Sequence, residues 1–290
     1  MTDIDCVVKA GAQIGESSIW DEKHHLLYWV DIPAKKLHRY EPESKYDAVW
    51  QLPEEPGAVA LRASGGVVLA MRSGFYAFPF NRPDPILLAR LEGEPKTNRL
   101  NDGRIDPAGR FWSGSVNEAN RDPTGALYCL GLDHKIEKKI AEIGCSNSLC
   151  WSLDGKTMYH ADSFTWKIQA YDFDAASGAI ANRRIFIDVP RDEGLPDGAT
   201  VDAEDCLWVT HWGHGHLKRY DPKGALMTSI QMPVTNITCP AFGGRNLDVI
   251  YVTSATFRLT PEQKAQQPLA GGLFAVHAGV KGVVEKRYRG

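Results

Sequence analysis

Hydrophobic and polar positions along this chain fall into six similar segments. Each segment reads as a short strand-like run, a tight polar turn such as DPAG or LDGK, and a second run rich in β-branched and aromatic residues. This pattern is typical of a β-hairpin. The six segments are IWDEKHHLLYWVD from Ile19, ALRASGGVVLAMRS from Ala60, RIDPAGRFWSGS from Arg104, CWSLDGKTMYHADS from Cys150, TVDAEDCLWVTHW from Thr200 and AFGGRNLDVIYVTSA from Ala241.

The hairpins recur at a nearly constant interval. Equivalent points in their second strands are spaced by 41, 43, 47, 49 and 43 residues, and these points are Leu27, Val68, Phe111, Met158, Leu207 and Ile250. A repeat of this length is typical of a four-stranded propeller blade, and most hairpins are followed by a further strand pair. A β-sandwich would explain the alternation but not the sixfold recurrence. We therefore predict an all-β fold, a six-bladed β-propeller of four-stranded antiparallel blades, as a single domain over residues 1–290.

One short helix is predicted inside the long loop of the sixth blade, in the segment TPEQKAQQPLA. Thr260 suits the N-cap, and Pro261 suits the first helical position. Gln263 completes a capping-box pattern, and Pro268 limits the extension of the helix.

The composition limits which binding partners are expected, but it does not change the predicted fold. The 290 residues are 43% hydrophobic and 24% charged, with a formal net charge of -3. No run of Lys or Arg marks a surface for nucleic acid or a membrane, so neither partner is expected. The N-terminal segment does not read as a secretory signal, and no apolar run is long enough to span a membrane, so a cytoplasmic location is expected. Six scattered cysteines without a CxxC pair argue against a disulfide scaffold and a zinc ribbon.

Oxygen-bearing side chains occur in the same phase of four blades. Each lies four residues before a landmark of an inner strand, and the four are Glu16, Asn101, Asn147 and Asp197. The same step reaches Gly57 and Thr238 in the second and sixth blades. Inner strands line the central channel of a propeller, so these positions are expected to converge at one end of it. Carboxylate and amide oxygens around a gap suit a divalent cation, whereas the alternative is that each residue only caps a turn.

The loops between second and third strands return to the same face. The two longest contain VNEANRDPTG and ATFRLTPEQKAQQPLAG and are candidate lids. In the loop HWGHGH, alternation scatters the side chains, so we expect His211 or His214 to contact a substrate rather than three histidines to bind a metal. Trp212 is placed to stack on a sugar. The basic residues expected on this face suggest an anionic substrate, and they are Arg72, Arg99, Arg121 and Arg258.

With these residues in view, the sequence resembles the senescence marker protein, gluconolactonase and regucalcin family of six-bladed propellers. The resemblance runs nearly end to end through GESSIWD, RLNDGRIDPAGRFWSG, NSLCWSLDGKTMYHADS, PDGATVDAEDCLWVTHW, AFGG and LAGGLF. It implies that one divalent metal ion is bound by Glu16, Asn147 and Asp197. Oxygen ligands favour calcium, magnesium or manganese, and open coordination also admits zinc or ferrous iron, so the identity of the metal stays open.

The resemblance also implies that the substrate is held by Arg99, Asn101 and an acidic contact from the third blade, for which Glu118 is the nearest candidate. Two departures stand out. Ser17 and Ser18 replace a common Gly-Pro pair, and Leu100 stands where the family often has proline. Neither departure removes a proposed ligand.

Together with these residues, the resemblance implies hydrolysis of a sugar lactone to the aldonic acid, with Asp197 as the base that takes a proton from water. The absence of a GxSxG motif agrees with a mechanism that has no covalent intermediate. Two alternatives stay open. One is an esterase or phosphotriesterase activity, and the other is a calcium-binding regulatory propeller without turnover. The oligomeric state is also open.

Overall fold

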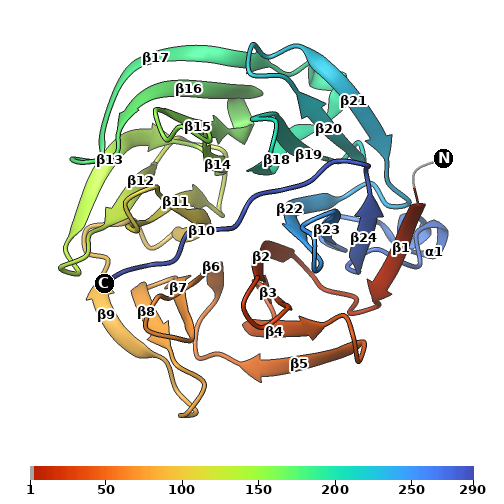
Figure 1. Cartoon of the computed structure of the whole chain (residues 1–290), viewed down its shortest axis with the longest axis horizontal. Coiled ribbons are helices and arrows are strands. Elements are labelled where there is room, and N and C mark those ends of the chain that lie inside the picture. The colour runs from red at the N-terminus through yellow and green to blue at the C-terminus, as the bar shows by residue number, and fades with distance from the viewer. Residues whose placement is uncertain (1–2) are drawn as a thin grey trace.

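The computed structural model describes residues 3–290 and shows six four-stranded antiparallel sheets arranged in a ring (Figure 1). This confirms the predicted six-bladed β-propeller. Blade one contains β2 (Gly15–Asp21), β3 (Leu26–Asp31), β4 (Lys36–Glu41) and β5 (Tyr46–Gln51). Blade two contains β6 (Pro56–Leu61), β7 (Val67–Met71), β8 (Gly74–Phe78) and β9 (Ile86–Arg90). Blade three contains β10 (Asn98–Ile105), β11 (Phe111–Asn117), β12 (Gly125–Leu130) and β13 (Ile136–Ile143).

The remaining blades continue around the ring. Blade four contains β14 (Ser146–Trp151), β15 (Thr157–Asp162), the 3-10 helix η1 (Ser163–Thr165), β16 (Lys167–Asp174) and β17 (Ala179–Asp188). The 3-10 helix η2 (Arg191–Glu193) leads into blade five, which contains β18 (Leu195–Val201), β19 (Leu207–Trp212), β20 (His216–Tyr220) and β21 (Leu226–Gln231). Blade six contains β22 (Ile237–Gly243), β23 (Val249–Ser254), β24 (Leu273–His277) and, as its outermost strand, β1 (Asp3–Val8).

The ring is closed by pairing the two ends of the chain. Strand β1 pairs antiparallel with β24, from Asp3 opposite His277 to Val8 opposite Leu273. Figure 1 shows the red N-terminal strand beside the blue β24. The closing contacts therefore join residues that are far apart in sequence, and they protect the outer edge of β24 from solvent.

Burial decreases from the channel outward. Every residue of β2, β10 and β22 is buried, whereas the outer strand β9 is mostly exposed. The six points that define the sequence repeat are all buried, at 0% or 1% relative exposure, because they pack between neighbouring blades. The recurrence of hydrophobic positions in the sequence is thus the recurrence of one packing position per blade.

The channel has two different ends. The inner strands begin at one end, which we call the pocket end, and finish at the other. The final residues, 278–290, cross this second end, and Figure 1 shows the dark blue segment passing over the centre of the ring. This C-terminal strap is held by the Arg104–Glu285 ion pair and by Arg287, which donates to Asp21 over 2.6 Å. We call this the strap end.

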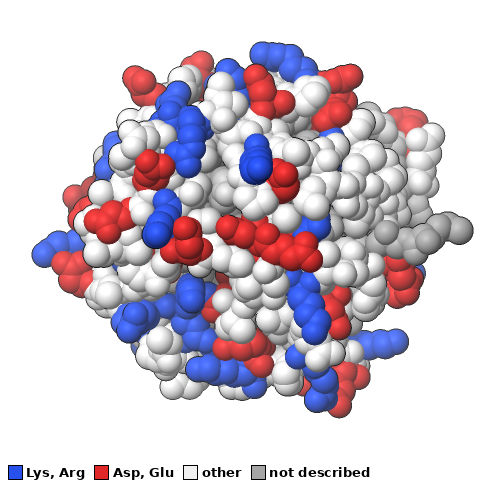
Figure 2. All heavy atoms as spheres, turned by 45° about the horizontal axis from the view of Figure 1, so that its top comes forward, with Lys and Arg blue, Asp and Glu red and all other residues white. Residues whose placement is uncertain are grey.

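Helix α1 (Pro261–Gln266) lies where it was predicted, in the loop between β23 and β24. The Thr260 side chain accepts a hydrogen bond from the Gln263 backbone, and the Gln263 side chain accepts one from the Thr260 backbone, which confirms the capping box. Within residues 3–290, no helix has the length and apolar character needed to cross a bilayer. Figure 2 shows acidic and basic side chains interspersed over the face that it presents.

Candidate functional site

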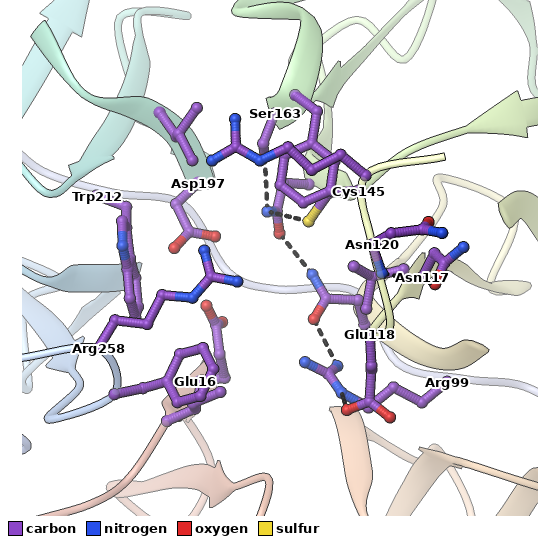
Figure 3. Close-up of a pocket in the computed structure, with 18 of the residues that line it drawn as sticks. Glu16, Arg99, Asn117, Glu118, Asn120, Cys145, Ser163, Asp197, Trp212 and Arg258 are labelled. Atoms are coloured by element: carbon purple, nitrogen blue, oxygen red, sulfur yellow. Dashed lines mark hydrogen bonds and ion pairs between the residues drawn. The ribbon is translucent and has the colours of Figure 1, made fainter. Parts of the chain in front are cut away.

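A cavity of about 380 Å³ opens at the pocket end of the channel (Figure 3). The structure brings four predicted residues to its lining, one from each of four inner strands: Glu16, Asn101, Asn147 and Asp197. The predicted substrate residues Arg99 and Glu118 line it as well. The cavity therefore combines acidic, amide and basic groups over a small volume.

A β-bulge in each inner strand aims these side chains. The register of the first strand pair shifts directly after Glu16 and after Asn147, and the shifted segments of blades three and five contain Asn101 and Asp197. A bulge bends the strand and redirects the side chains beside it. Ser17, which follows Glu16, has a φ of 53°, a left-handed conformation that favours glycine. Its hydroxyl accepts a hydrogen bond from the Val59 backbone over 2.8 Å, which helps to hold the conformation that serine otherwise disfavours.

The other two blades contribute no side chain to the site. A side chain at Gly57 would collide with the backbone of Leu100, since a Cβ there would lie 2.1 Å from its carbonyl oxygen. Thr238 is fully buried, and its hydroxyl donates to the Gly15 carbonyl over 2.5 Å. Both positions serve the packing between blades.

The two carboxyl groups at the site are buried and close to each other. Glu16 is 4% exposed and Asp197 is 7% exposed, and neither makes an ion pair with any of residues 3–290. Burial, followed by the nearby charge of Asp102, raises the pKa of Glu16 to about 8. Burial and the charge of Glu16 raise the pKa of Asp197 well above its ordinary value. Two buried carboxylates without a counter-ion repel each other, so this arrangement favours a cation between them.

The amide groups beside the carboxylates are held in a fixed orientation. The Nδ2 of Asn147 donates to the Ser163 hydroxyl over 2.8 Å, while its Oδ1 accepts from Asn101 over 3.0 Å. An amide oxygen has a second lone pair, so Asn147 can still act as a ligand. Hard oxygen donors of this kind suit a divalent cation, and the residues present fit the predicted metal. Within residues 3–290, no group of three or more His, Cys, Asp and Glu side chains forms an alternative metal site.

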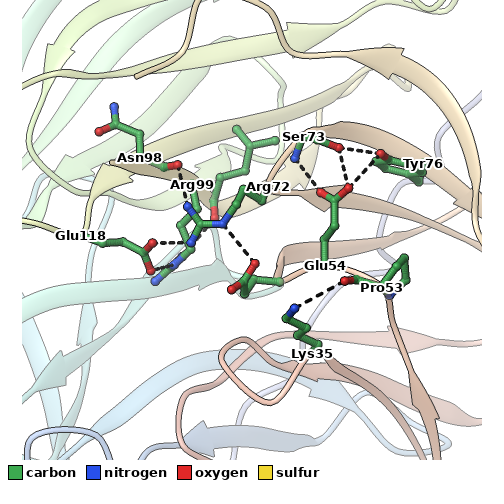
Figure 4. Close-up of polar contacts among 11 residues, drawn as sticks. Lys35, Pro53, Glu54, Arg72, Ser73, Tyr76, Asn98, Arg99 and Glu118 are labelled. Carbon is green, nitrogen blue, oxygen red and sulfur yellow. Dashed lines mark hydrogen bonds and ion pairs between the residues drawn. The ribbon is translucent and has the colours of Figure 1, made fainter. Parts of the chain in front are cut away.

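Arg99 connects the Asn101 amide to Glu118, which directly follows the second strand of the same blade. Its Nε donates to Glu118 over 2.9 Å and its Nη1 donates to Asn101 Oδ1 over 2.7 Å. Glu118 also pairs with Arg72, which bonds to Glu55 over 3.0 Å (Figure 4). Arg72 is not among the lining residues of the cavity. It therefore lies on the expected face, where it orients Glu118 but does not line the cavity itself.

His211 does not lie where a substrate contact requires it. It is fully buried and does not line the cavity. Its Nδ1 donates to the Glu193 carbonyl over 2.9 Å, and burial lowers its pKa to about 4. Side chains alternate along β19, so the next residue, Trp212, faces the cavity instead. His214 stacks on His216 with ring centroids 4.6 Å apart, away from the lining.

Both predicted lids reach the cavity. The loop between β11 and β12 supplies Glu118 and Arg121, and the loop between β23 and β24 supplies Phe257 and Arg258. Phe164 from blade four adds an aromatic wall that sequence reasoning missed. Phe164 has no polar group, and its position in the sequence fits no repeat, so nothing in the sequence distinguishes it from a residue that packs in the core.

Sequence reasoning also missed Asp102, a buried carboxyl group in the channel. It is 3% exposed, its Oδ2 accepts from the Leu149 backbone over 2.9 Å, and burial raises its pKa. Its charge adds to the repulsion between Glu16 and Asp197. Its only signal in the sequence is that it follows Asn101 directly, which is ordinary for a turn or a bulge.

Comparison with known proteins places the chain among related propellers. The SMP-30/Gluconolactonase/LRE-like family model matches residues 14–256. Human regucalcin is 37% identical over 99% of this chain and 98% of its own length. A solved calcium-binding protein, regucalcin from Agrobacterium tumefaciens, superimposes with a TM-score of 0.95 at 29% identity, covering 99% of this chain and 98% of that one. A luciferin-regenerating enzyme gives a TM-score of 0.92 at 29% identity and covers 100% of both chains.

Proposed function

This chain belongs to the SMP-30/gluconolactonase/LRE-like family, and from that premise we propose that it is a metal-dependent hydrolase that opens a sugar lactone to the aldonic acid. The observation that carries this proposal is the pair of buried carboxyl groups, Glu16 and Asp197, which lack any counter-ion within residues 3–290 and line one cavity with Arg99 and Asn101. A structural role does not explain such a pair, because burying unpaired charge destabilises a fold.

Glu16, Asn147 and Asp197 would hold one divalent cation. Their oxygen donors suit calcium, magnesium and manganese, and they also admit zinc and ferrous iron. When bound, the cation supplies Lewis-acid polarisation of the lactone carbonyl.

The remaining steps belong to the chain's own residues. Asp197 takes the proton of the attacking water as the general base. Arg99 and Asn101, already joined by a 2.7 Å hydrogen bond, hold the sugar hydroxyls in one orientation. Glu118 keeps the Arg99 guanidinium in place through its 2.9 Å contact with Nε.

The test is acid release in weak buffer from a panel of neutral and acidic sugar lactones, simple esters and a phosphotriester. Each substrate is given to chelated protein and to protein restored with each divalent metal. Lactone hydrolysis should need the metal, and Asp197→Asn should lower kcat/KM at least about a thousandfold. Asp133→Asn, which removes an exposed carboxylate whose side chain is 58% accessible, is the matched control and should leave the rate unchanged.

A second candidate function is metal binding without turnover. It is favoured by the Agrobacterium relative, which is described as a calcium-binding protein. Tight metal binding by calorimetry with no lactone, ester or phosphotriester turnover under any metal would replace the lactonase proposal with this one. Faster turnover of esters or the phosphotriester than of every lactone would instead assign the site to that alternative hydrolase class.

A further inference from the structure

Two arginines in the cavity have no acidic partner. Six charged side chains line it: Glu16, Arg99, Glu118, Arg121, Asp197 and Arg258. Arg99 pairs with Glu118, and Glu16 with Asp197 forms the proposed cation site. Arg121 and Arg258 remain, and neither makes an ion pair with any of residues 3–290. The three acidic and three basic groups sum to zero, so the unpaired guanidinium groups are a local feature of one part of the lining and not a net charge of the cavity.

Arg121 is supported by aromatic rings on blade four. It lies on the loop between β11 and β12, and its guanidinium carbon is 5.0 Å from the centroid of the Phe164 ring and 5.9 Å from that of Trp166. Phe164 also lines the cavity. A guanidinium that stacks on a ring keeps its N–H edge available to an acceptor, so Arg121 can still donate two parallel hydrogen bonds.

Arg258 is held in place by its backbone. Its φ of 62° is uncommon for a residue other than glycine. The preceding residues fix this conformation, because the Thr256 and Phe257 amides donate to the Ala12 and Gln13 carbonyls, each over 3.0 Å. Figure 3 shows the Arg258 side chain pointing into the cavity, on the side of Glu16 and Asp197. The loop between β23 and β24 therefore places at the cavity a guanidinium group that has no ion-pair partner among residues 3–290.

We propose that Arg121 and Arg258 select lactones that carry a second acidic group, a carboxylate, phosphate ester or sulfonate, on the carbon chain away from the ring carbonyl. This inference rests on the proposed lactonase function and names its substrate class. A neutral sugar needs only hydroxyl-binding groups, which Arg99 and Asn101 already provide. Two guanidinium groups match the planar or forked oxygens of such an anion, and the bonds are strong because both partners are charged.

The reaction itself is ordinary ester hydrolysis. The water oxygen bonds to the carbonyl carbon, the bond between that carbon and the ring oxygen breaks, and the ring oxygen takes a proton. The product carries two acidic groups, the new carboxylate and the original anion. No oxidant, reductant or further reactant is needed.

The kinetic test compares three lactones with the metal-loaded full chain: neutral gluconolactone, 6-phosphogluconolactone and glucarolactone. The variants are Arg121→Gln and Arg258→Gln, which keep an N–H donor but remove the charge. Arg245→Gln is the matched control, because that side chain is 72% exposed on the hairpin of blade six. We expect kcat/KM to be at least about tenfold higher for one or both anionic lactones than for the neutral one.

Each pocket variant should reduce that preference about tenfold, with a smaller loss on gluconolactone, while Arg245→Gln leaves every rate unchanged. The preference should also shrink as ionic strength rises. Equal kcat/KM for neutral and anionic lactones would overturn the inference while leaving the lactonase proposal intact. An equal fall in the preference with Arg245→Gln would overturn it too, because a distant charge would then explain the effect. The phosphate and carboxylate substrates show which anion the site takes.

Binding provides a readout that does not depend on turnover. By calorimetry, glucarate and 6-phosphogluconate should bind at least about tenfold tighter than gluconate, and Arg121→Gln and Arg258→Gln should remove the difference. If no lactone is hydrolysed but this preference holds, the lactonase proposal fails and the anion selectivity stands. If the three acids bind equally well, the anion selectivity fails whatever the enzyme assay shows.

Discussion

The two ends of strand β18 carry the same residue type in opposite environments. Asp197 lies at the pocket end, 7% exposed, with no ion pair among residues 3–290. Asp202 follows the other end of the strand and is fully buried. It accepts from Arg219 Nε over 2.7 Å and from Trp208 Nε1 over 2.8 Å. Asp197 thus lacks an ion-pair partner among residues 3–290, whereas Asp202 has both an ion-pair partner and a further hydrogen-bond donor.

The same contrast recurs in blade three. Asn101 faces the pocket, and five residues later Asp106 accepts from Trp112 Nε1 over 2.8 Å and Arg110 Nε over 2.5 Å. At the strap end, each of these buried carboxylates is paired with an arginine, and the pairing stabilises the blades. At the pocket end, the fold tolerates unmatched carboxyl groups. The comparison teaches that a buried acid in this propeller indicates a ligand site only where the chain supplies no partner for it.

The largest expected effect is at the strap end. Asp202→Asn leaves the buried Arg219 without its charged partner, and breaking a buried ion pair costs about 3–5 kcal/mol. Urea unfolding should show this loss in the free energy of unfolding, while kcat/KM of the folded protein stays within about threefold. A stability change below about 1 kcal/mol would remove the contrast between the two ends.

Metal binding should stabilise the pocket end by a comparable amount. A divalent cation at a hundred times its Kd is expected to add about 2.7 kcal/mol to the free energy of unfolding, measured as a rise in Tm. Glu16, with a pKa of about 8, is protonated at pH 7 in the metal-free protein, so metal binding should release protons and tighten from pH 6 to 8. Calorimetry in buffers of different ionisation enthalpy measures this release. Metal affinity that is unchanged in Asp197→Asn would contradict the assigned site.

Removing one acid at the pocket end should stabilise the chelated protein. Burial raises the pKa of Glu16 in the folded chain above its value in the unfolded chain. Its contribution to the free energy of unfolding is therefore present in full below the unfolded pKa and is lost as the pH rises through about 8. Asp197→Asn removes one of the two repelling charges, and we expect a gain of about 1–2 kcal/mol at pH 8.5 that disappears at pH 5. Urea unfolding at both pH values measures it. A loss of stability at pH 8.5 would show that the Asp197 carboxylate makes a stabilising interaction in the chelated protein.

The last expected effect appears only as a change of stability with pH, and it concerns His160 in β15 of blade four. It is 2% exposed, and burial lowers its pKa to about 4. The unfolded chain therefore binds more protons than the folded one between about pH 6.5 and 4, and stability falls as the pH falls through this window. His160→Gln, which keeps a partner for the Ser146 hydroxyl, should flatten that slope by about 1.4 kcal/mol per pH unit. An identical slope in both proteins would refute the assignment.

The hydrophobic pattern was enough to predict the blades, because each blade buries the same positions and a period of two specifies which face is buried. The four-residue step also brought Glu16, Asn101, Asn147 and Asp197 to one cavity. The prediction for His211 was wrong because a single residue of strand alternation separates the cavity from the interior, and Trp212 takes the cavity side. The role of the site residues in metal and substrate binding stays a prediction.

By itself, the sequence determined the number of blades, the helix cap at Thr260 and the level along the channel at which polar residues gather, since these follow from local periodicity. Only the tertiary structure decided how the ring closes, because β1 and β24 lie at opposite ends of the chain. It alone also distinguished Asp197 from Asp202. Whether a buried carboxylate has a partner depends on side chains brought to it by other strands, and local sequence does not encode that contact.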